Sequence, residues 1–94
     1  MQYYVYILYS SAINRYYIGH TGEPIEERLR KHLSNHSGFT SKAKDWEIKY
    51  TERFRTKSEA YTRELYIKRK KSVKFIQNLI SSAGYPPIPN GTDV

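Results

Sequence analysis

The alternation of apolar and polar positions at the start of the chain predicts a β-hairpin. Residues 2–10 (QYYVYILYS) carry apolar or aromatic side chains on both faces of an extended segment, which is typical of a strand covered on both sides. Turn-forming residues 10–14 separate it from a second short run, residues 15–19 (RYYIG). We expect two antiparallel strands, with Tyr17 and Gly19 on one face of the second strand.

The middle of the chain predicts a helix and a third strand. Residues 20–23 have loop composition, and the proline and two glutamates that follow suit a helix amino terminus. Apolar residues then recur every four positions from 25 to 33, which predicts an amphipathic helix ending near Asn35. Residues 36–44 again have loop composition, and residues 46–54 alternate Trp, Ile and Tyr with polar residues, as in a strand with one buried face.

Two further helices are predicted in the carboxy-terminal part. Thr56 and Glu59 match a capping box, and helix formers follow throughout residues 58–70. Ser72 can cap a last helix with an apolar stripe, and the proline- and glycine-containing residues 83–94 predict an extended or mobile tail. The sequence therefore predicts a single α+β domain over residues 1–82: a small three-stranded antiparallel sheet flanked by about three helices, in the order ββαβαα.

Composition excludes several classes of site. The 94 residues contain no Cys, so a disulfide framework, a Cys-type zinc site and a thiol nucleophile are excluded. No apolar stretch approaches the roughly 20 residues of a membrane span, and we expect a cytoplasmic protein with no membrane partner and no organic cofactor. Any metal would be held by oxygen or imidazole.

The charge balance points to a polyanionic partner. Lys and Arg outnumber Asp and Glu by 16 to 9, a net charge of +7, and phosphate neutralisation by such residues supplies most non-specific nucleic-acid affinity. The alternative is that positive charge only maintains solubility. Residues 53–74 form a basic region, and within it the predicted nucleic-acid-binding residues are Arg63, Lys68, Arg69, Lys70, Lys71 and Lys74.

Three groups of polar residues fall where apolar ones were expected. Arg28 and His32 are one helical turn apart beside the apolar stripe, and either face the sheet or form an ordinary basic pair in water. Glu64 falls in an inward-facing stripe, where a carboxylate needs a cation or an ion pair such as one with a neighbouring lysine. Tyr6 and Tyr17 either pack in the core or place their hydroxyls at a cleft, where a phenol can donate, accept or act as a base.

These residues together resemble the GIY-YIG nuclease superfamily, and within it the small stand-alone proteins related to the amino-terminal catalytic domain of the excision-repair subunit UvrC. Residues 17–19 (YIG) are the second signature tripeptide, and residues 4–6 (YVY) take the place of the first but lack its leading Gly. The segment 28–32 is similar to the Arg-x-x-x-His helix of the family, and 64–68 resembles the segment with its metal-binding glutamate. The likeness extends from residue 2 to about residue 80.

The resemblance implies a nuclease in which Tyr17 activates water, Tyr6 assists, Arg28 holds the phosphate and Glu64 binds Mg²⁺ or Mn²⁺. It also implies that His32 lies beside Arg28, in contact with the tyrosine or the phosphate. His20 is a candidate to line the cleft, and Asn78 is the nearest match to an Asn that many members place after the glutamate. The expected activity is magnesium-dependent endonucleolytic hydrolysis of nucleic acid, with DNA expected and RNA left open. The alternative is a basic nucleic-acid-binding module of the same fold with little hydrolytic activity of its own.

Overall fold

The three predicted strands form one antiparallel sheet with the amino-terminal strand at its centre. The computed structural model describes residues 2–82. The strands are β1 (Tyr3–Ser10), β2 (Arg15–Thr21) and β3 (Glu47–Phe54), in the sheet order β2-β1-β3. With the helices, this confirms the α+β class and the order ββαβαα. The predicted tail, residues 83–94, lies outside the described residues.

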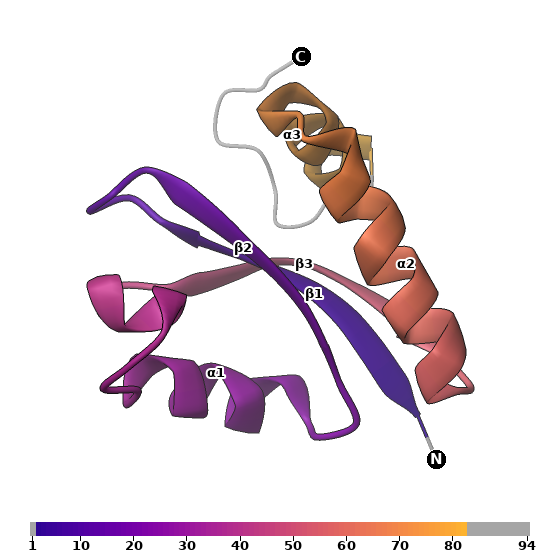
Figure 1. Cartoon of the computed structure of the whole chain (residues 1–94), viewed down its shortest axis with the longest axis horizontal. Helices are drawn as coiled ribbons and strands as arrows, with labels where there is room; N and C mark the ends of the chain where they lie inside the picture. The colour runs from indigo at the N-terminus through magenta and orange to yellow at the C-terminus, as the bar shows by residue number, and fades with distance from the viewer. Residues whose placement is uncertain (1, 83–94) are drawn as a thin grey trace.

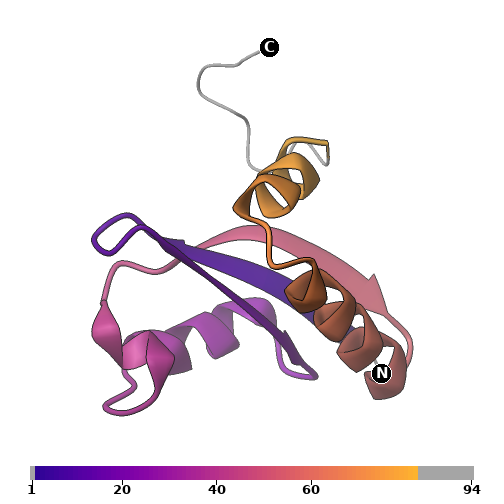
Figure 2. The same cartoon turned by 45° about the horizontal axis from the view of Figure 1, so that its top comes forward.

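Helices cover both faces of the sheet (Figures 1 and 2). Helix α1 (Ile25–Leu33) lies on one face, and α2 (Lys57–Lys70) and α3 (Val73–Ser82) lie on the other; a short 3-10 helix, η1 (Phe39–Lys42), falls in the predicted loop. The predicted capping box at Thr56 is present, and the Ser72 hydroxyl accepts the backbone N–H of Phe75 at the start of α3. Within residues 2–82, no helix has the length and apolar character needed to cross the membrane.

Strand β1 contributes to two separate cores because both of its faces are covered, as predicted. Val5 and Ile7 pack in the core under α2 and α3, whereas Tyr6 and Leu8 pack in the core over α1. All four side chains are at most 2% exposed. Tyr6 is therefore fixed in position by the packing of the central strand.

The prediction that residues 46–54 have one buried face is wrong. Ile7 pairs with Tyr50 but Leu8 pairs with Ile48, so the intervening Lys49 forms a bulge. A bulge inserts one residue and reverses the faces beyond it. Ile48 therefore packs in the core with α1, and Tyr50 packs in the core with α2.

The predicted loop at residues 20–23 begins two residues later than expected. Strand β2 continues through His20 and Thr21 because both pair with β1, opposite Val5 and Tyr4. His20 is therefore held on an edge strand next to Gly19. This placement determines which helix its side chain meets.

Candidate active site

One half of the candidate site is a hydrogen-bond chain centred on Tyr6. The Tyr6 hydroxyl lies 2.8 Å from Nε2 of His32, and Nε of Arg28 donates to the same hydroxyl at 3.4 Å. Since the hydroxyl accepts from Arg28, its own proton is directed to His32 Nε2. His32 then carries its proton on Nδ1 and donates it to the Thr40 hydroxyl, 3.1 Å away.

Burial sets the protonation states of this chain. Burial raises the pKa of Tyr6 to about 12, against the opposing effect of the Arg28 hydrogen bond. Burial, followed by the charge of Arg28, lowers the pKa of His32 below its usual value. At neutral pH Tyr6 is a phenol and His32 a neutral imidazole, so Tyr6 is a hydrogen-bond donor here and not a proton acceptor.

Gly19 is required by the close approach of β2 to Tyr6. A Cβ atom at this position would lie 2.5 Å from the Tyr6 hydroxyl oxygen, 2.7 Å from Tyr6 Cζ and 3.2 Å from Tyr17 Cε2. Contacts below about 3 Å cannot be accommodated by a ring held in a packed core. The glycine of the tripeptide at residues 17–19 thus allows the Tyr6 hydroxyl to lie against the β2 backbone.

Tyr17 lies beside this chain without joining it. Its ring meets His32 edge-on with centroids 4.9 Å apart and stacks on Phe39 at 6.2 Å. Within residues 2–82 the Tyr17 hydroxyl has no hydrogen-bond partner, and the two terminal nitrogens of Arg28 have no acceptor. Both groups are half-buried and chemically available to a ligand.

The other half of the site is Glu64 on α2. Glu64 is 7% exposed, as its position in the inward-facing stripe predicted. Its Oε1 lies 2.6 Å from Nδ1 of His20, and Lys68 forms an ion pair with Oε2. The His20 ring also lies 5.4 Å from the ring of Tyr61, centroid to centroid.

The two halves meet at adjacent residues of β2. Gly19 faces α1 and touches Tyr6, and the next residue, His20, faces α2 and bonds to Glu64. Because β2 is an edge strand, its outer side carries no further strand. The half-buried Tyr17 and the Glu64 carboxylate therefore lie on opposite faces of the same edge strand.

Residues 2–76 match the GIY-YIG catalytic domain. The chain belongs to the GIY-YIG family. Comparison with curated proteins and with solved structures found no significant match. Membership of the GIY-YIG family implies nuclease-type hydrolysis of phosphodiester bonds in nucleic acid, generally with a divalent metal.

Glu64 has the chemistry to hold a divalent metal, which GIY-YIG nucleases generally use. Within the part of the chain that the structure describes, no three His, Asp or Glu side chains gather into a metal cage. Mg²⁺ retains several waters and is bound through one or two carboxylates plus substrate phosphates, so one buried carboxylate at a phosphate site suits it. The Lys68 ammonium forms an ion pair with one Glu64 oxygen, and the Lys68 side chain is exposed and flexible.

The remaining predicted residues differ in their surroundings and in their relation to the candidate site. Arg69, Lys70, Lys71 and Lys74 are exposed on α2 and α3 or between them. Arg63 instead makes a bidentate ion pair with Glu52, at 2.9 and 3.1 Å. Asn78 is exposed on α3 and has no hydrogen bond to any site residue described in residues 2–82.

Sequence reasoning missed Thr40 and Phe39, which hold His32 and Tyr17. Thr40 accepts hydrogen bonds from His32 Nδ1 and from Asn35 Nδ2, and its carbonyl accepts from Trp46 Nε1. Both residues belong to a segment with loop composition and no periodicity. No pattern in the sequence connects this segment to His32.

Proposed function

We propose that this GIY-YIG protein is an endonuclease that hydrolyses DNA phosphodiester bonds with a divalent cation, Mg²⁺ or Mn²⁺. One observation carries the proposal: the Tyr17 hydroxyl and the terminal nitrogens of Arg28 have no hydrogen-bond partner within residues 2–82, whereas the Tyr6 hydroxyl is fully engaged. Two groups with the chemistry to bind water and phosphate are thus presented together, beside a buried carboxylate.

The roles follow from these bonds. Arg28 is oriented by its Nε bond to Tyr6, and its free nitrogens bind the phosphate oxygens and stabilise the charge that develops there. Tyr17 orients the attacking water and, as the phenolate whose own proton has passed to solvent, accepts the proton that the water loses. Glu64 would hold the divalent cation, whose charge would add to that of Arg28 at the phosphate.

Tyr6 and His32 act as positioning residues in this scheme. Tyr6 keeps its proton and donates a hydrogen bond to His32, which Thr40 fixes in turn. A locked chain of this kind holds Arg28 in one orientation without taking part in proton transfer. The relation to stand-alone proteins similar to the UvrC catalytic domain depends on the sequence motifs and stays a prediction.

A basic nucleic-acid-binding module with little hydrolytic activity is the second candidate. One observation favours it: both Glu64 oxygens are already held, by His20 and by Lys68. Glu64 would hold a cation only in exchange for one of these two partners.

A nicking assay separates the two functions. Wild type, Tyr17→Phe and Glu64→Gln are incubated with supercoiled, single-stranded and branched DNA in Mg²⁺, Mn²⁺ or EDTA. We expect metal-dependent cleavage by wild type and a loss of about 100-fold or more in each variant, the usual size of general-base and charge-stabilising effects. Tyr9→Phe is the matched control, because its hydroxyl bonds only to Asn14 at the hairpin end.

Cleavage that survives EDTA, or that Tyr17→Phe leaves unchanged, contradicts the proposed mechanism. DNA binding by all proteins with no cleavage of any substrate favours the binding module.

A further inference from the structure

One side of α2 carries a stripe of residues with the candidate metal ligand at its centre. Lys57, Tyr61, Glu64, Lys68 and the C-cap residue Lys71 follow one another at intervals of four and three, so they lie along one side of the helix. We call these five residues the α2 stripe. It is about 21 Å long at 1.5 Å per residue.

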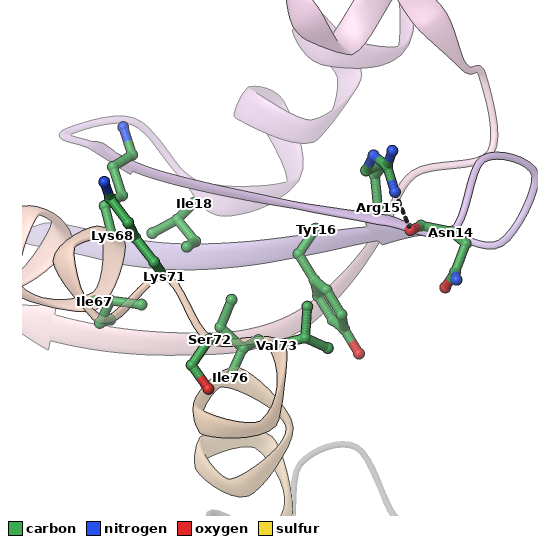
Figure 3. Close-up of a pocket in the computed structure, with 10 residues that line it drawn as sticks. All are labelled: Asn14, Arg15, Tyr16, Ile18, Ile67, Lys68, Lys71, Ser72, Val73 and Ile76. Carbon is green, nitrogen blue, oxygen red and sulfur yellow. Dashed lines mark hydrogen bonds between the residues drawn. The ribbon is translucent and has the colours of Figure 1, made fainter.

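A pocket adjoins the stripe on the carboxy-terminal side of Glu64 (Figure 3). It has a volume of about 390 Å³ and lies between β2, the end of α2 and the start of α3. Its apolar surface includes Ile18, Ile67 and Ile76. Lys68 and Lys71 extend in the same direction at one end of it. An apolar surface beside two ammonium groups suits a nucleotide, which combines a flat base with a phosphate.

A second hollow adjoins the stripe on the amino-terminal side of Glu64. It has a volume of about 650 Å³ and is lined by His20, Lys57, Ser58 and Tyr61. Tyr61 is 50% exposed, so half of its side-chain surface is open to a ligand. An exposed ring beside a lysine is the surface on which an unpaired base stacks.

The backbone at Lys71 supports a binding role for its side chain. Lys71 has φ 48° in the left-handed region, where a helix normally ends in glycine. Its ammonium has no carboxylate partner within residues 2–82. Any residue other than glycine costs stability in this conformation. The Lys71 side chain adds a positive charge beside the pocket.

We propose that the α2 stripe binds a single-stranded segment of nucleic acid on both sides of the scissile phosphate. A base stacks on Tyr61 on one side of Glu64, and on the other side a nucleotide occupies the pocket with its phosphate at Lys68 and Lys71. The proposal rests on the proposed nuclease function and deepens it, since stacking on Tyr61 requires a base released from its own helix. The substrate class is therefore single-stranded or branched nucleic acid.

Binding is measured without cleavage, by fluorescence anisotropy of labelled oligonucleotides in EDTA across a series of salt concentrations. Lys71→Gly removes the charge and suits the left-handed backbone, so we expect an unchanged or higher Tm with weaker single-strand binding and a salt slope reduced by about 0.7. Tyr61→Ala is expected to weaken single-strand binding by about fivefold or more, and Tyr61→Phe to restore it.

Matched controls lie outside the stripe. Lys44→Gln removes one exposed lysine charge elsewhere, and Tyr66→Ala removes an exposed ring of α2 that is not on the stripe. Both are expected to bind like wild type. Duplex and RNA oligonucleotides are run in parallel.

Weaker single-strand binding by the α2-stripe variants than by the controls supports the proposal, whether or not the protein cleaves nucleic acid. A failure of the nuclease assay is therefore a separate result. Tighter binding to duplex than to single strands, or equal binding by Lys71→Gly, Tyr61→Ala and the controls, would overturn it. No binding to any nucleic acid would overturn both proposals.

Discussion

Gly19→Ala tests whether the contact between β2 and Tyr6 holds the candidate site together. The added Cβ would meet the Tyr6 hydroxyl oxygen at 2.5 Å and Cζ at 2.7 Å. Tyr6 is 2% exposed and tied to His32 and Arg28, so it cannot move away without breaking those bonds. The strain therefore falls on the core and on the hydrogen-bond chain together.

The cost can be worked out from these contacts. Overpacking costs about 1–3 kcal/mol, and leaving the buried His32 nitrogen without its donor costs about 1–3 kcal/mol more. Loss of glycine freedom in the unfolded chain offsets about 0.4–1 kcal/mol. The net destabilisation is about 1–5 kcal/mol, which lowers Tm by at least about 4 °C in a domain of this size.

Urea unfolding and thermal melts check this value, with Gly22→Ala as the control. A Cβ at Gly22 meets the half-exposed ring of Tyr3 at 3.0 Å, a contact that a small rotation relieves. Cleavage by Gly19→Ala is expected to fall further than folded protein is lost, because Arg28 loses its fixed orientation. If Gly19→Ala melts within 1 °C of wild type and cuts normally, the close approach does not hold the site.

Three further predictions concern neighbouring bonds. Tyr6→Phe is expected to lose about 1–3 kcal/mol of stability, measured in urea, and to reduce cleavage less than Tyr17→Phe does, because Tyr6 positions Arg28 without transferring a proton. The pKa of His32 is lowered in the folded state, so below about pH 6.5 the folded protein binds fewer protons than the unfolded protein. The free energy of unfolding is therefore highest above that pH and decreases as the pH falls. His32→Gln is expected to remove this part of the pH dependence in a series of urea melts. Arg63→Gln breaks the half-exposed bidentate pair with Glu52 and is expected to cost about 1 kcal/mol of stability. DNA affinity, measured by anisotropy, is expected to stay nearly unchanged. A large loss of DNA affinity without a loss of Tm would instead support the prediction from sequence that Arg63 binds nucleic acid.

The fold was predictable where its determinants are local. The capping box at Thr56, the buried stripe containing Glu64 and the two-sided burial of residues 3–10 all follow from spacings within one element. The bulge at Lys49 and the continuation of β2 to Thr21 depend on pairing with β1, which no spacing within a single element specifies. Elements were therefore predicted better than the register between them.

The candidate site was predictable in its residues but not in its internal bonds. Arg28 and His32 were recognisable because polar side chains flanked an apolar stripe, and the family motifs added the tyrosines. The Tyr6 hydroxyl is hydrogen-bonded and the Tyr17 hydroxyl is not. This difference depends on the burial of Tyr6 and on the loop that supplies Thr40 to His32. Such assignments follow from contacts between distant segments, which one sequence does not encode in any local pattern.

The register of β2 links the stability of the fold to the geometry of the site. Ile18 packs in the core under α2, which forces its neighbours Tyr17 and Gly19 to face α1 and leaves His20 facing Glu64 two positions later. A slip of one residue would reverse every side chain of the strand and separate Tyr17 from His32. The apolar burial of Ile18 therefore specifies the placement of the groups on both faces, and the same edge strand that completes the sheet carries Tyr17 toward one half of the candidate site and His20 toward the other.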